Sequence, residues 1–550
     1  SEYLTYDLDV PGAGYLVSGT RTVFHDDGGK YVDRAFSDFD GLGHFRTVTH
    51  TDDFQLGGSP HVERTFWNPT RGSEPNWTPP TPTEPWILEV YSEKQATEGT
   101  STVLTESSFD ADGRLSCERR RLSPTARNLH DVVVTYTYDS AGNPIQENWH
   151  GGDLDEVGTA EICSVVDAPS TTILHTWQAG VRATTQHAGA NFKGLDRTIH
   201  PGTGLVSSSR DVSGPETTYL YDSMGRVTKA TPPDGEQPIH FTYHQPNPPA
   251  TLGKIRVYRG DPETPYSDGE FWIDDFGRVY EERRLMPQGW ARKRTFFNDN
   301  GWKSDESEWG AVGGGEAGLV FTGYRDYDPF GRPTLIHPPD STPADRAHDV
   351  TISYTGTRVV SRTVSVGTGR NSTTNEPVET AVTTTERYDG QGRLVQVVEP
   401  AGANGASTTT SYGYDCAGRL RTVTQVDGTD TQTRTFSYDG RGFLTSETHP
   451  EKGVTGNGTV TYSLFDARGK AHRKEDGSAT LDFVYDGAER LIEVNEVTGA
   501  TTSRPLKVLT YGAANQGTNK RLGRLETATR YNYVDLATLI GQEDWHEYQV

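Results

Sequence analysis

The sequence repeats a short pattern in which an aromatic residue is followed by Asp, two variable residues and Gly, and then usually by Arg. With 19 Phe, 26 Tyr, 60 Gly and 76 acidic residues among 550, composition alone predicts about 0.7 copies by chance. Nine clean copies are present. A repeat of this strength constrains the fold more than any other feature, because each copy must form the same local structure.

The clean copies are Phe39-Asp40-x-x-Gly43, Phe109-Asp110-x-x-Gly113-Arg114, Tyr138-Asp139-x-x-Gly142, Tyr221-Asp222-x-x-Gly225-Arg226, Tyr327-Asp328-x-x-Gly331-Arg332, Tyr388-Asp389-x-x-Gly392-Arg393, Tyr414-Asp415-x-x-Gly418-Arg419, Tyr438-Asp439-x-x-Gly442 and Phe465-Asp466-x-x-Gly469. Three degenerate copies are Ile273-Asp274-x-x-Gly277-Arg278, Phe297-Asn298-x-x-Gly301 and Tyr485-Asp486-x-x-Glu489-Arg490, in which Glu replaces Gly. From Tyr388 onward the copies are 26, 24, 27 and 20 residues apart, which is the length of one hairpin with its connections.

The chemistry of the pattern predicts a hairpin tip. An Asp side chain accepts a hydrogen bond from the backbone N–H two residues on and so initiates a turn. A Gly four residues after the aromatic supplies the positive φ of a bulged hairpin loop. A second class of turn, such as Asp427-Gly428 and Asp476-Gly477, lies between the tips and leaves room for strands of about six to eight residues.

The segments that enter the tips alternate as strands do. Tyr412 and Tyr414 fall on one face, as do Phe436 and Tyr438. The 60 Gly and 31 Pro residues exclude a helical fold and are typical of many short strands joined by turns. We therefore predict an all-β chain of tandem hairpins in one long sheet, in which the motif aromatics pack in columns and repetition supplies the stability.

These residues resemble the RHS family, whose hallmark is the YD repeat, as in YDGQGRLVQVVEP (388–400) and YDSMGRVTKATPPDG (221–235). The resemblance covers most of residues 109–500. In that family the repeats form a long sheet that spirals into a hollow shell. Its members include polymorphic bacterial toxins, the B and C subunits of insecticidal Tc toxin complexes, and teneurins. The resemblance thus implies a shell, or part of one, around a toxic C-terminal polypeptide, or a teneurin-like extracellular adhesion body.

One departure from the family concerns the C-terminus. Family toxins end the array with a DPxGR-type segment that contains an aspartyl autoprotease, and the last fifty residues here show neither that segment nor a recognisable toxin domain. We expect a fragment, a processed product or the ordered part of a longer protein. Self-cleavage is not assigned to this chain.

The repeat pattern divides the chain into six regions. They are 1–70, an N-terminal β region with one early copy; 71–108, a Pro-rich connector (71–86) and a strand; 109–340, an irregular array with an insertion at 147–215; 341–387, motif-poor strands; 388–500, a regular array; and 501–550, a C-terminal segment.

Charge and cysteine content limit the partners. The net charge of -24 repels phosphate backbones, which argues against nucleic acid as a partner. No stretch has the 18 or more apolar residues of a spanning helix, and the first residues lack a signal core, so we expect a soluble chain. Cys117, Cys163 and Cys416 are odd in number and lack CxxC spacing, which supports neither a disulfide framework nor a zinc site.

Searches for catalytic and metal-binding signatures give only weak candidates. HExxH, GxxxxGK[ST] and GxSxG are missing. Asp110-x-Asp112-Gly113 resembles the start of a calcium loop but lacks its later acids, so a turn is favoured. Asp299, Glu306 and Glu308 near Trp302 and Trp309 are compatible with a sugar site, although a solvated strand face explains them better. His44, His150 and His175 show no ligand spacing.

The repeated Asp is interpreted as structural, and the repeated Arg as a partner for a neighbouring repeat's acid or a cover for a tyrosine ring. We therefore predict a non-enzymatic shell, without cofactor or metal, that encloses an effector or toxin polypeptide for secretion and delivery. Its partners would be that polypeptide, made as a separate chain or as a C-terminal continuation of the same protein, and a delivery apparatus. The alternatives are an extracellular body that binds glycans or proteins, and a polysaccharide-active enzyme. The expected location is secreted or cell surface, with storage in the cytoplasm before delivery.

Overall fold

The computed structural model describes residues 2–10, 14–24, 29–40, 43–54, 60–68, 89–233, 235–244, 253–340, 348–370, 377–400, 407–452, 458–515, 520–533 and 539–546. Within these ranges the chain consists of β-strands, turns and a few single-turn 3₁₀ helices, with no α-helix. The predicted connector at 71–86 lies outside the described residues, as do Gly41 and Leu42 of the first repeat copy.

The strands of the first half are β1 (Glu2–Val10), β2 (Gly14–Phe24), β3 (Lys30–Phe39), β4 (Phe45–Asp52), β5 (His61–Trp67), β6 (Tyr91–Glu98), β7 (Ser101–Phe109), β8 (Leu115–Arg120), β9 (Val132–Tyr138), β10 (Pro144–Gly151), β11 (Thr171–Gln178), β12 (Val181–His187), β13 (Leu195–Ile199), β14 (Val206–Arg210), β15 (Glu216–Tyr221), β16 (Val227–Thr231), β17 (Ile239–His244), β18 (Gly253–Gly260), β19 (Pro265–Ile273) and β20 (Val279–Met286).

The strands of the second half are β21 (Gly289–Phe297), β22 (Lys303–Ser307), β23 (Gly310–Ala311), β24 (Phe321–Tyr327), β25 (Pro333–His337), β26 (Val350–Thr355), β27 (Val359–Arg370), β28 (Pro377–Tyr388), β29 (Leu394–Glu399), β30 (Thr408–Tyr414), β31 (Leu420–Asp427), β32 (Asp430–Tyr438), β33 (Leu444–Thr448), β34 (Thr459–Phe465), β35 (Ala471–Glu475), β36 (Thr480–Tyr485), β37 (Leu491–Gly499), β38 (Thr502–Tyr511), β39 (Leu525–Tyr533) and β40 (Leu539–His546). The 3₁₀ helices are η3 (Val312–Gly314), η4 (Glu316–Gly318) and η5 (Pro450–Lys452).

The strands form one continuous antiparallel meander. Neighbours in the chain pair with each other along the whole described ladder, from β1 with β2 to β39 with β40. The one side branch is the short β23, which pairs with β21 while β22 pairs with β24. The prediction of an all-β chain of tandem hairpins in one long sheet is therefore confirmed.

The sheet is a thin wall with little apolar core. Most strand positions are only half-buried, and hydroxyl side chains pair across strands, as in Thr363 with Thr383 at 2.8 Å and Thr424 with Thr433 at 3.2 Å. Such pairs contribute a few tenths to about 1 kcal/mol each. Stability is therefore spread over many similar strand pairs instead of one central core.

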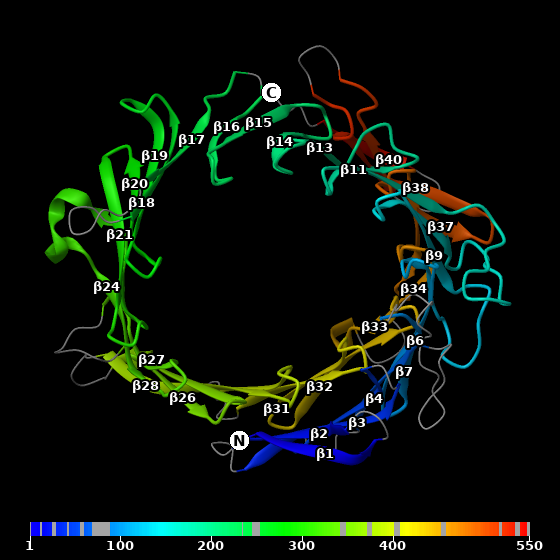
Figure 1. The fold of residues 1–550 in the computed structure, drawn as a ribbon, viewed down its shortest axis with the longest axis horizontal. Helices are drawn as coiled ribbons and strands as arrows, with labels where there is room; N and C mark the ends of the chain where they lie inside the picture. Colours follow the sequence, from blue (N-terminus) through cyan, green and yellow to red (C-terminus); the bar gives the residue numbers. More distant parts are fainter. Residues whose placement is uncertain are drawn as a thin grey trace.

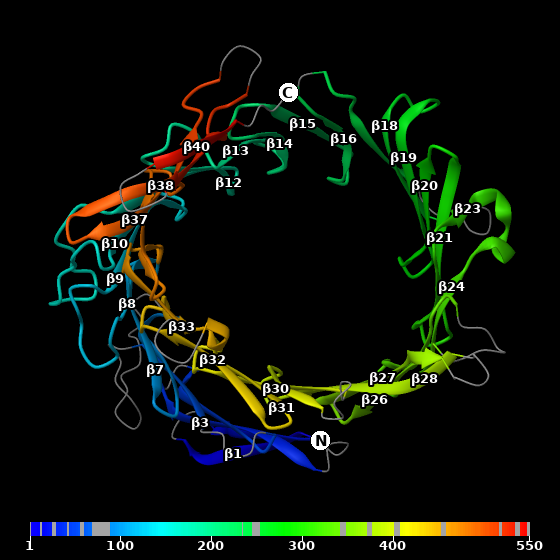
Figure 2. The same cartoon turned by 180° about the vertical axis from the view of Figure 1, so that it is seen from behind.

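The meander curls into a ring that overlaps itself (Figures 1 and 2). The chain runs around the ring from β1 through β9, β14 and β21 and returns to the side of the ring where β1 lies. We call this part of the chain the first winding (β1–β25). It then continues as the second winding (β26–β40), which runs alongside the early strands of the first. The predicted spiralling sheet that forms a hollow shell, or part of one, is confirmed in this shape.

The two windings touch along a line that we call the seam. Hydrogen bonds that cross it join residues 288 to 322 positions apart in the chain. Ser101 contacts Cys416, the Gly440 N–H donates to the Leu122 carbonyl, and the Asp153 N–H donates to the Phe465 carbonyl. One full circuit of the ring therefore takes roughly 300 residues, a length set by the curvature accumulated over many strands.

The seam has a regular register. The tip between β30 and β31 lies on the β6–β7 turn, the β32–β33 tip on the β8–β9 connection, the β34–β35 tip on the β10–β11 connection, the β36–β37 tip on the β12–β13 connection, and the β38–β39 tip on the β14–β15 turn. Each tip thus touches the connection that is 24 strand numbers earlier. Tips of the second winding fit against connections at the opposite edge of the sheet of the first.

One disulfide corrects the interpretation of the cysteines. Cys117 on β8 is bonded to Cys163 in the β10–β11 connection, with 5.8 Å between the Cα atoms, while Cys416 is a buried free thiol. The expectation that the three cysteines form no disulfide is therefore wrong for one pair. The two residues are 46 positions apart in sequence, and only the pairing of β8, β9 and β10 brings them together.

The close approach at the seam predicts the effect of a single methyl group. A Cβ added at Gly440 would lie 2.4 Å from the Arg121 carbonyl oxygen and 2.6 Å from that of Leu122. We expect Gly440→Ala to lower the free energy of unfolding by about 1–3 kcal/mol, because backbone must move to make room. Urea denaturation measures this change.

The matched control is Gly367→Ala, since a Cβ added at Gly367 meets nothing within 4 Å. This variant should unfold within about 0.5 kcal/mol of the wild type. Equal losses in both variants would contradict a close-packed seam.

Candidate functional site: the repeat tips and the seam

Each repeat tip is closed by the carboxylate of its Asp. In the β30–β31 tip, the Asp415 N–H donates to the Arg419 carbonyl at 2.9 Å and the Gly418 N–H donates to the Asp415 carbonyl at 2.9 Å. The Asp415 Oδ1 atom accepts hydrogen bonds from the N–H groups of Ala417 and Arg419, both at 2.9 Å. Its Oδ2 atom accepts from the Arg419 Nε at 2.7 Å. The carboxylate therefore satisfies backbone donors that the turn would otherwise leave open.

The same geometry recurs in the other tips. Backbone N–H groups four residues on donate to Oδ1 of Asp110, Asp139, Asp222, Asp274, Asp328, Asp389, Asp439, Asp466 and Asp486, and to Oδ1 of Asn298 in the degenerate tip. Asp40 makes the matching bond with the His44 N–H. The motif residues predicted from sequence are thus brought together within each tip, and the tips follow one another along the edge of the sheet.

The Gly of the motif takes the conformation that the turn requires. The φ angle is +79° at Gly225 and +74° at Gly418, in the left-handed region that Gly occupies without cost. The degenerate tip has Glu489 at this position with φ +63°. Its carboxylate pairs with Arg468 at 3.1 Å and with Lys470. Glu489 thus makes these ion pairs while its backbone is in the left-handed region, which is strained for a residue other than Gly.

The motif Arg connects one repeat to the next. Besides its bond to Asp415, the Arg419 guanidinium lies 4.5 Å from the ring centroid of Tyr438, the aromatic residue of the following tip. The Tyr414 hydroxyl in turn donates to the Leu394 carbonyl of the preceding repeat at 2.7 Å. Arginine over an aromatic ring contributes about 0.5–1 kcal/mol at exposed sites.

This connection recurs along the array. Further guanidinium–ring pairs are Arg114 with Tyr138, Arg226 with Tyr243, Arg278 with Phe297, Arg332 with Tyr354, Arg393 with Tyr414, and Arg490 with Tyr511. The Arg pairs with the acid of its own repeat, and Arg393 also lies 3.9 Å from Glu98 of the first winding. Its cover of the next aromatic ring is as the sequence suggested. Three aromatic positions were missed by the motif search, because the Asp that would follow is absent: Tyr243, Tyr354 and Tyr511.

The tip geometry lowers the pKa of six motif carboxyls, those of Asp110, Asp139, Asp222, Asp274, Asp328 and Asp486. At Asp222 the backbone N–H of Arg226 is the main cause, opposed by partial desolvation and reinforced by the Arg226 guanidinium. At Asp139 the side-chain amide of Asn143 has the largest effect in lowering the pKa. These carboxylates are ionised at neutral pH, and their acceptor capacity is used within the turn.

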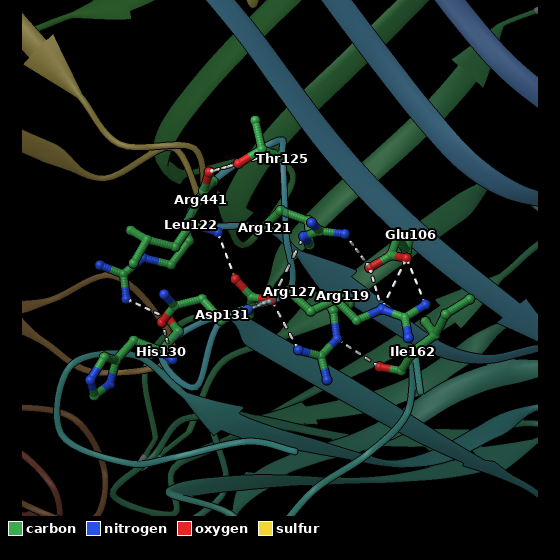
Figure 3. A network of polar contacts seen from close by, with 12 residues as sticks. Glu106, Arg119, Arg121, Leu122, Thr125, Arg127, His130, Asp131, Ile162 and Arg441 are labelled. Atoms are coloured by element: carbon green, nitrogen blue, oxygen red, sulfur yellow. Dashed lines mark hydrogen bonds and ion pairs between the residues drawn. The ribbon is translucent and has the colours of Figure 1, made fainter. Parts of the chain in front are cut away.

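The centre of the seam is a polar cluster around Arg441 (Figure 3). The Arg441 side chain is 2% exposed and donates to the His130 carbonyl at 2.8 Å and to the Asp153 carboxylate at 2.9 Å. The other Asp153 oxygen accepts from the Phe465 N–H at 3.0 Å. One side chain of the second winding therefore binds two segments of the first.

Beside Arg441 lies a network of buried charges within the first winding (Figure 3). Arg119 and Asp131 are both fully buried and form an ion pair at 2.9 Å. Asp131 also accepts from the Leu122 N–H at 2.8 Å, and Glu106 pairs with Arg121 at 3.0 Å. The sequence search found none of these residues, because no motif marks them.

A small apolar cluster completes the seam. Val132, Val134 and Ala467 are buried together, with Tyr136, Trp149 and Phe443 packed against them. Ala467 belongs to the second winding and the two valines to the first. A sequence signal for the seam exists at this position: the residue after the motif Asp is Gly390, Cys416, Gly440, Ala467 or Gly487 in the five tips from Tyr388 onward.

The calcium-loop candidate is a closed turn. Arg114 pairs with Asp110 at 2.8 Å and with Asp112 at 2.6 Å, and the Asp112 N–H donates to Asp110. Across the described residues, no group of three or more His, Cys, Asp or Glu side chains is arranged to hold a metal ion.

The acids and tryptophans proposed for a sugar site are engaged with neighbours. Glu306 pairs with Lys303 at 3.1 Å, Trp302 packs on Tyr327 at 5.1 Å between ring centroids, and Trp309 lies under an arginine guanidinium. Asp299 lies in the β21–β22 tip, and Glu308 follows β22.

The three histidines lie apart from one another in the ladder. His44 contacts the Asp40 carboxylate at 3.0 Å, and His175 lies 3.1 Å from Glu147. His150 is buried, and this burial lowers its pKa. No helix in the described part of the chain is long and apolar enough to cross a membrane.

Comparison with known proteins identifies the repeats. A model of the RHS repeat matches residues 201–237 and 388–430, which contain the tips at Tyr221, Tyr388 and Tyr414. The chain therefore carries RHS repeats in these two stretches. Its tips are thus YD repeats, and the hydrogen bonds above give the physical basis of that sequence hallmark. No curated protein matches the chain.

Two solved structures have similar chains. One is described as the crystal structure of TcdB2-TccC3-Cdc42, with 11% identity, a TM-score of 0.44, and coverage of 96% of this chain and 41% of that chain. The other is TcdB2-TccC3 without its hypervariable C-terminal region, with 10% identity, a TM-score of 0.44, and coverage of 99% and 41%. The RHS chain described here spans about two fifths of those chains.

Acid should weaken the YD tips. Because the pKa of Asp222 is lower in the folded chain than its ordinary value of 3.8, its contribution to stability is present above that value and is lost as pH falls through the folded pKa. We expect the unfolding temperature to fall between about pH 5 and pH 2. The Asp222→Asn variant should unfold at a lower temperature than the wild type at pH 7, and this difference should disappear at pH 2.

Thermal unfolding followed by circular dichroism over this pH range measures the effect. Asp427→Asn, at an exposed strand end, is the control and should follow the wild-type curve. A stability loss in Asp222→Asn that is equal at pH 7 and pH 2 would show that the charge of the carboxylate has no part in the turn.

Removal of the seam arginine should destabilise the contact between windings. Arg441→Met keeps the length of the side chain and leaves Asp153 without its cation. We expect a loss of about 2–3 kcal/mol, below the range for fully buried pairs because Asp153 is 27% exposed. Arg434→Met removes a half-exposed ion pair with Glu451 and should cost less than about 1 kcal/mol. Similar urea midpoints for the two variants would contradict the role of Arg441.

Proposed function

We propose that this RHS-repeat chain is the wall of a container that encloses an effector or toxin polypeptide for secretion and delivery. The observation that supports it best is the seam. A binding platform needs only a curved sheet, whereas a wall must close on itself, and here the second winding contacts the first at six successive tips, from β28–β29 to β38–β39.

The chemistry of the tips fits a structural role. The motif carboxylates accept bonds from backbone N–H groups and arginines of their own turns, as in Asp415. Such groups are poorly placed to act on a substrate. We therefore assign the wall no reaction of its own and place any activity in the enclosed polypeptide.

The enclosed partner is proposed to be a polypeptide made as a continuation of the same protein or supplied with it. A wall of net charge -24 gives no reason to expect nucleic acid as the contents. Secretion, or display at the cell surface by a delivery apparatus, follows from this role as part of the proposal.

Native mass spectrometry of the product of the complete gene tests the proposal. A single assembly that releases a smaller polypeptide only on denaturation is the expected result, and Arg441→Met should release it at a lower urea concentration than Arg434→Met. An assembly with no retained polypeptide would contradict enclosure. Binding to immobilised glycans or cell-surface proteins would then be the function to measure.

A further inference from the structure

The connection between β10 and β11 is a long segment, residues 152–170, which we call the strap. It leaves the seam at Gly152 and Asp153 and returns to the sheet at β11. The Val157 side chain is buried, whereas Val165 and Val166 are 41% and 64% exposed. The strap therefore has a base at the seam and an outer part that is open to solvent.

Polar groups of the first winding hold the strap. The buried Arg119 donates to the Ile162 carbonyl at 2.9 Å and to the carbonyl of Glu161 at 3.2 Å. The Arg127 guanidinium donates to the Ala160 carbonyl at 2.7 Å. All three acceptors are backbone carbonyls, so they remain in place only while the strap keeps its path.

The disulfide is the covalent part of this attachment. It joins Cys163 of the strap to Cys117 on β8, two residues before Arg119. Cys117 is fully buried and Cys163 is half-buried, so an external thiol reaches the Cys163 sulfur first. It is the one disulfide within the described residues.

The base of the strap is also part of the seam. The Asp153 N–H donates to the Phe465 carbonyl at 2.6 Å, and its carboxylate accepts from the Phe465 N–H and from Arg441. His130 Nδ1 lies 3.1 Å from the Gly152 carbonyl oxygen. A change in the path of the strap is thus transmitted to the contact between windings through one residue.

We propose that the Cys117–Cys163 disulfide is a redox latch that holds the strap, and through Asp153 the seam, in the closed state. A dithiol reductant supplies two electrons: its thiolate attacks the Cys163 sulfur, Cys117 leaves and is protonated, and the second thiol of the reductant releases Cys163 while the reductant becomes a cyclic disulfide. The freed strap then exchanges its bonds to Arg119 for water. The use of this latch, opening in a reducing compartment after delivery, rests on the proposed container function.

Hydrogen–deuterium exchange of the full chain with and without dithiothreitol tests the latch. Thiol titration should show two additional thiols after reduction. Exchange in peptides containing 153–170 and 463–467 should accelerate by at least about tenfold, since a cross-link limits local opening. Peptides of the β19–β20 hairpin, which lies away from the strap, should keep their rates.

Two variants serve as controls. Cys117→Ser combined with Cys163→Ser should exchange rapidly at both segments and ignore dithiothreitol, whereas Cys416→Ser should respond as the wild type does. The wild-type comparison alone is decisive if the double variant does not fold. Two new thiols without faster exchange, no new thiols, or acceleration throughout the chain would each overturn the latch. None of these measurements involves the enclosed polypeptide. If no enclosed polypeptide is found, the container proposal is contradicted, but the test of the latch remains valid.

Discussion

The bond between the motif Asp and the backbone of its own turn is the interaction on which the structure depends. It closes each hairpin tip within five residues, so every repeat forms its tip from local contacts. The same carboxylate fixes the Arg, as Asp415 fixes Arg419, and the guanidinium then lies over the aromatic ring of the next tip. A local turn is thereby converted into a contact between repeats, and the order of the array follows from a bond repeated along it.

A thin sheet of this kind has little apolar area to bury, and the seam compensates with polar contacts. Arg441 pairs with Asp153 and Arg119 pairs with Asp131, and both arginines also donate to nearby carbonyl groups. Buried charges of this kind add little net stability but penalise wrong pairings strongly, because an unpaired charge inside the protein is costly. The seam therefore selects one register between the windings, with each tip against the connection 24 strand numbers earlier.

The disulfide and the strap constrain the seam in addition to the contacts made by the tips. The Cys117–Cys163 bond and the Arg119 hydrogen bonds act on the same segment, one by covalent constraint and the other by polar contacts. Since Asp153 at the base of that segment binds the second winding, the wall has one point at which a chemical change can reach the contact between windings. The repeat array alone has no such point, because its tips are alike.

The sequence by itself determined the hairpins, the all-β class and the positions of the tips, because Asp and Gly act on backbone within a few residues of themselves. It also carried a weak mark of the seam, the small residues after the Asp from Gly390 onward. Only the tertiary structure decided which connection each tip meets, that Cys117 and Cys163 are joined, and that Arg441 binds Asp153. Those pairings depend on curvature summed over many strands, which brings together residues about 300 positions apart, and no local pattern encodes that sum.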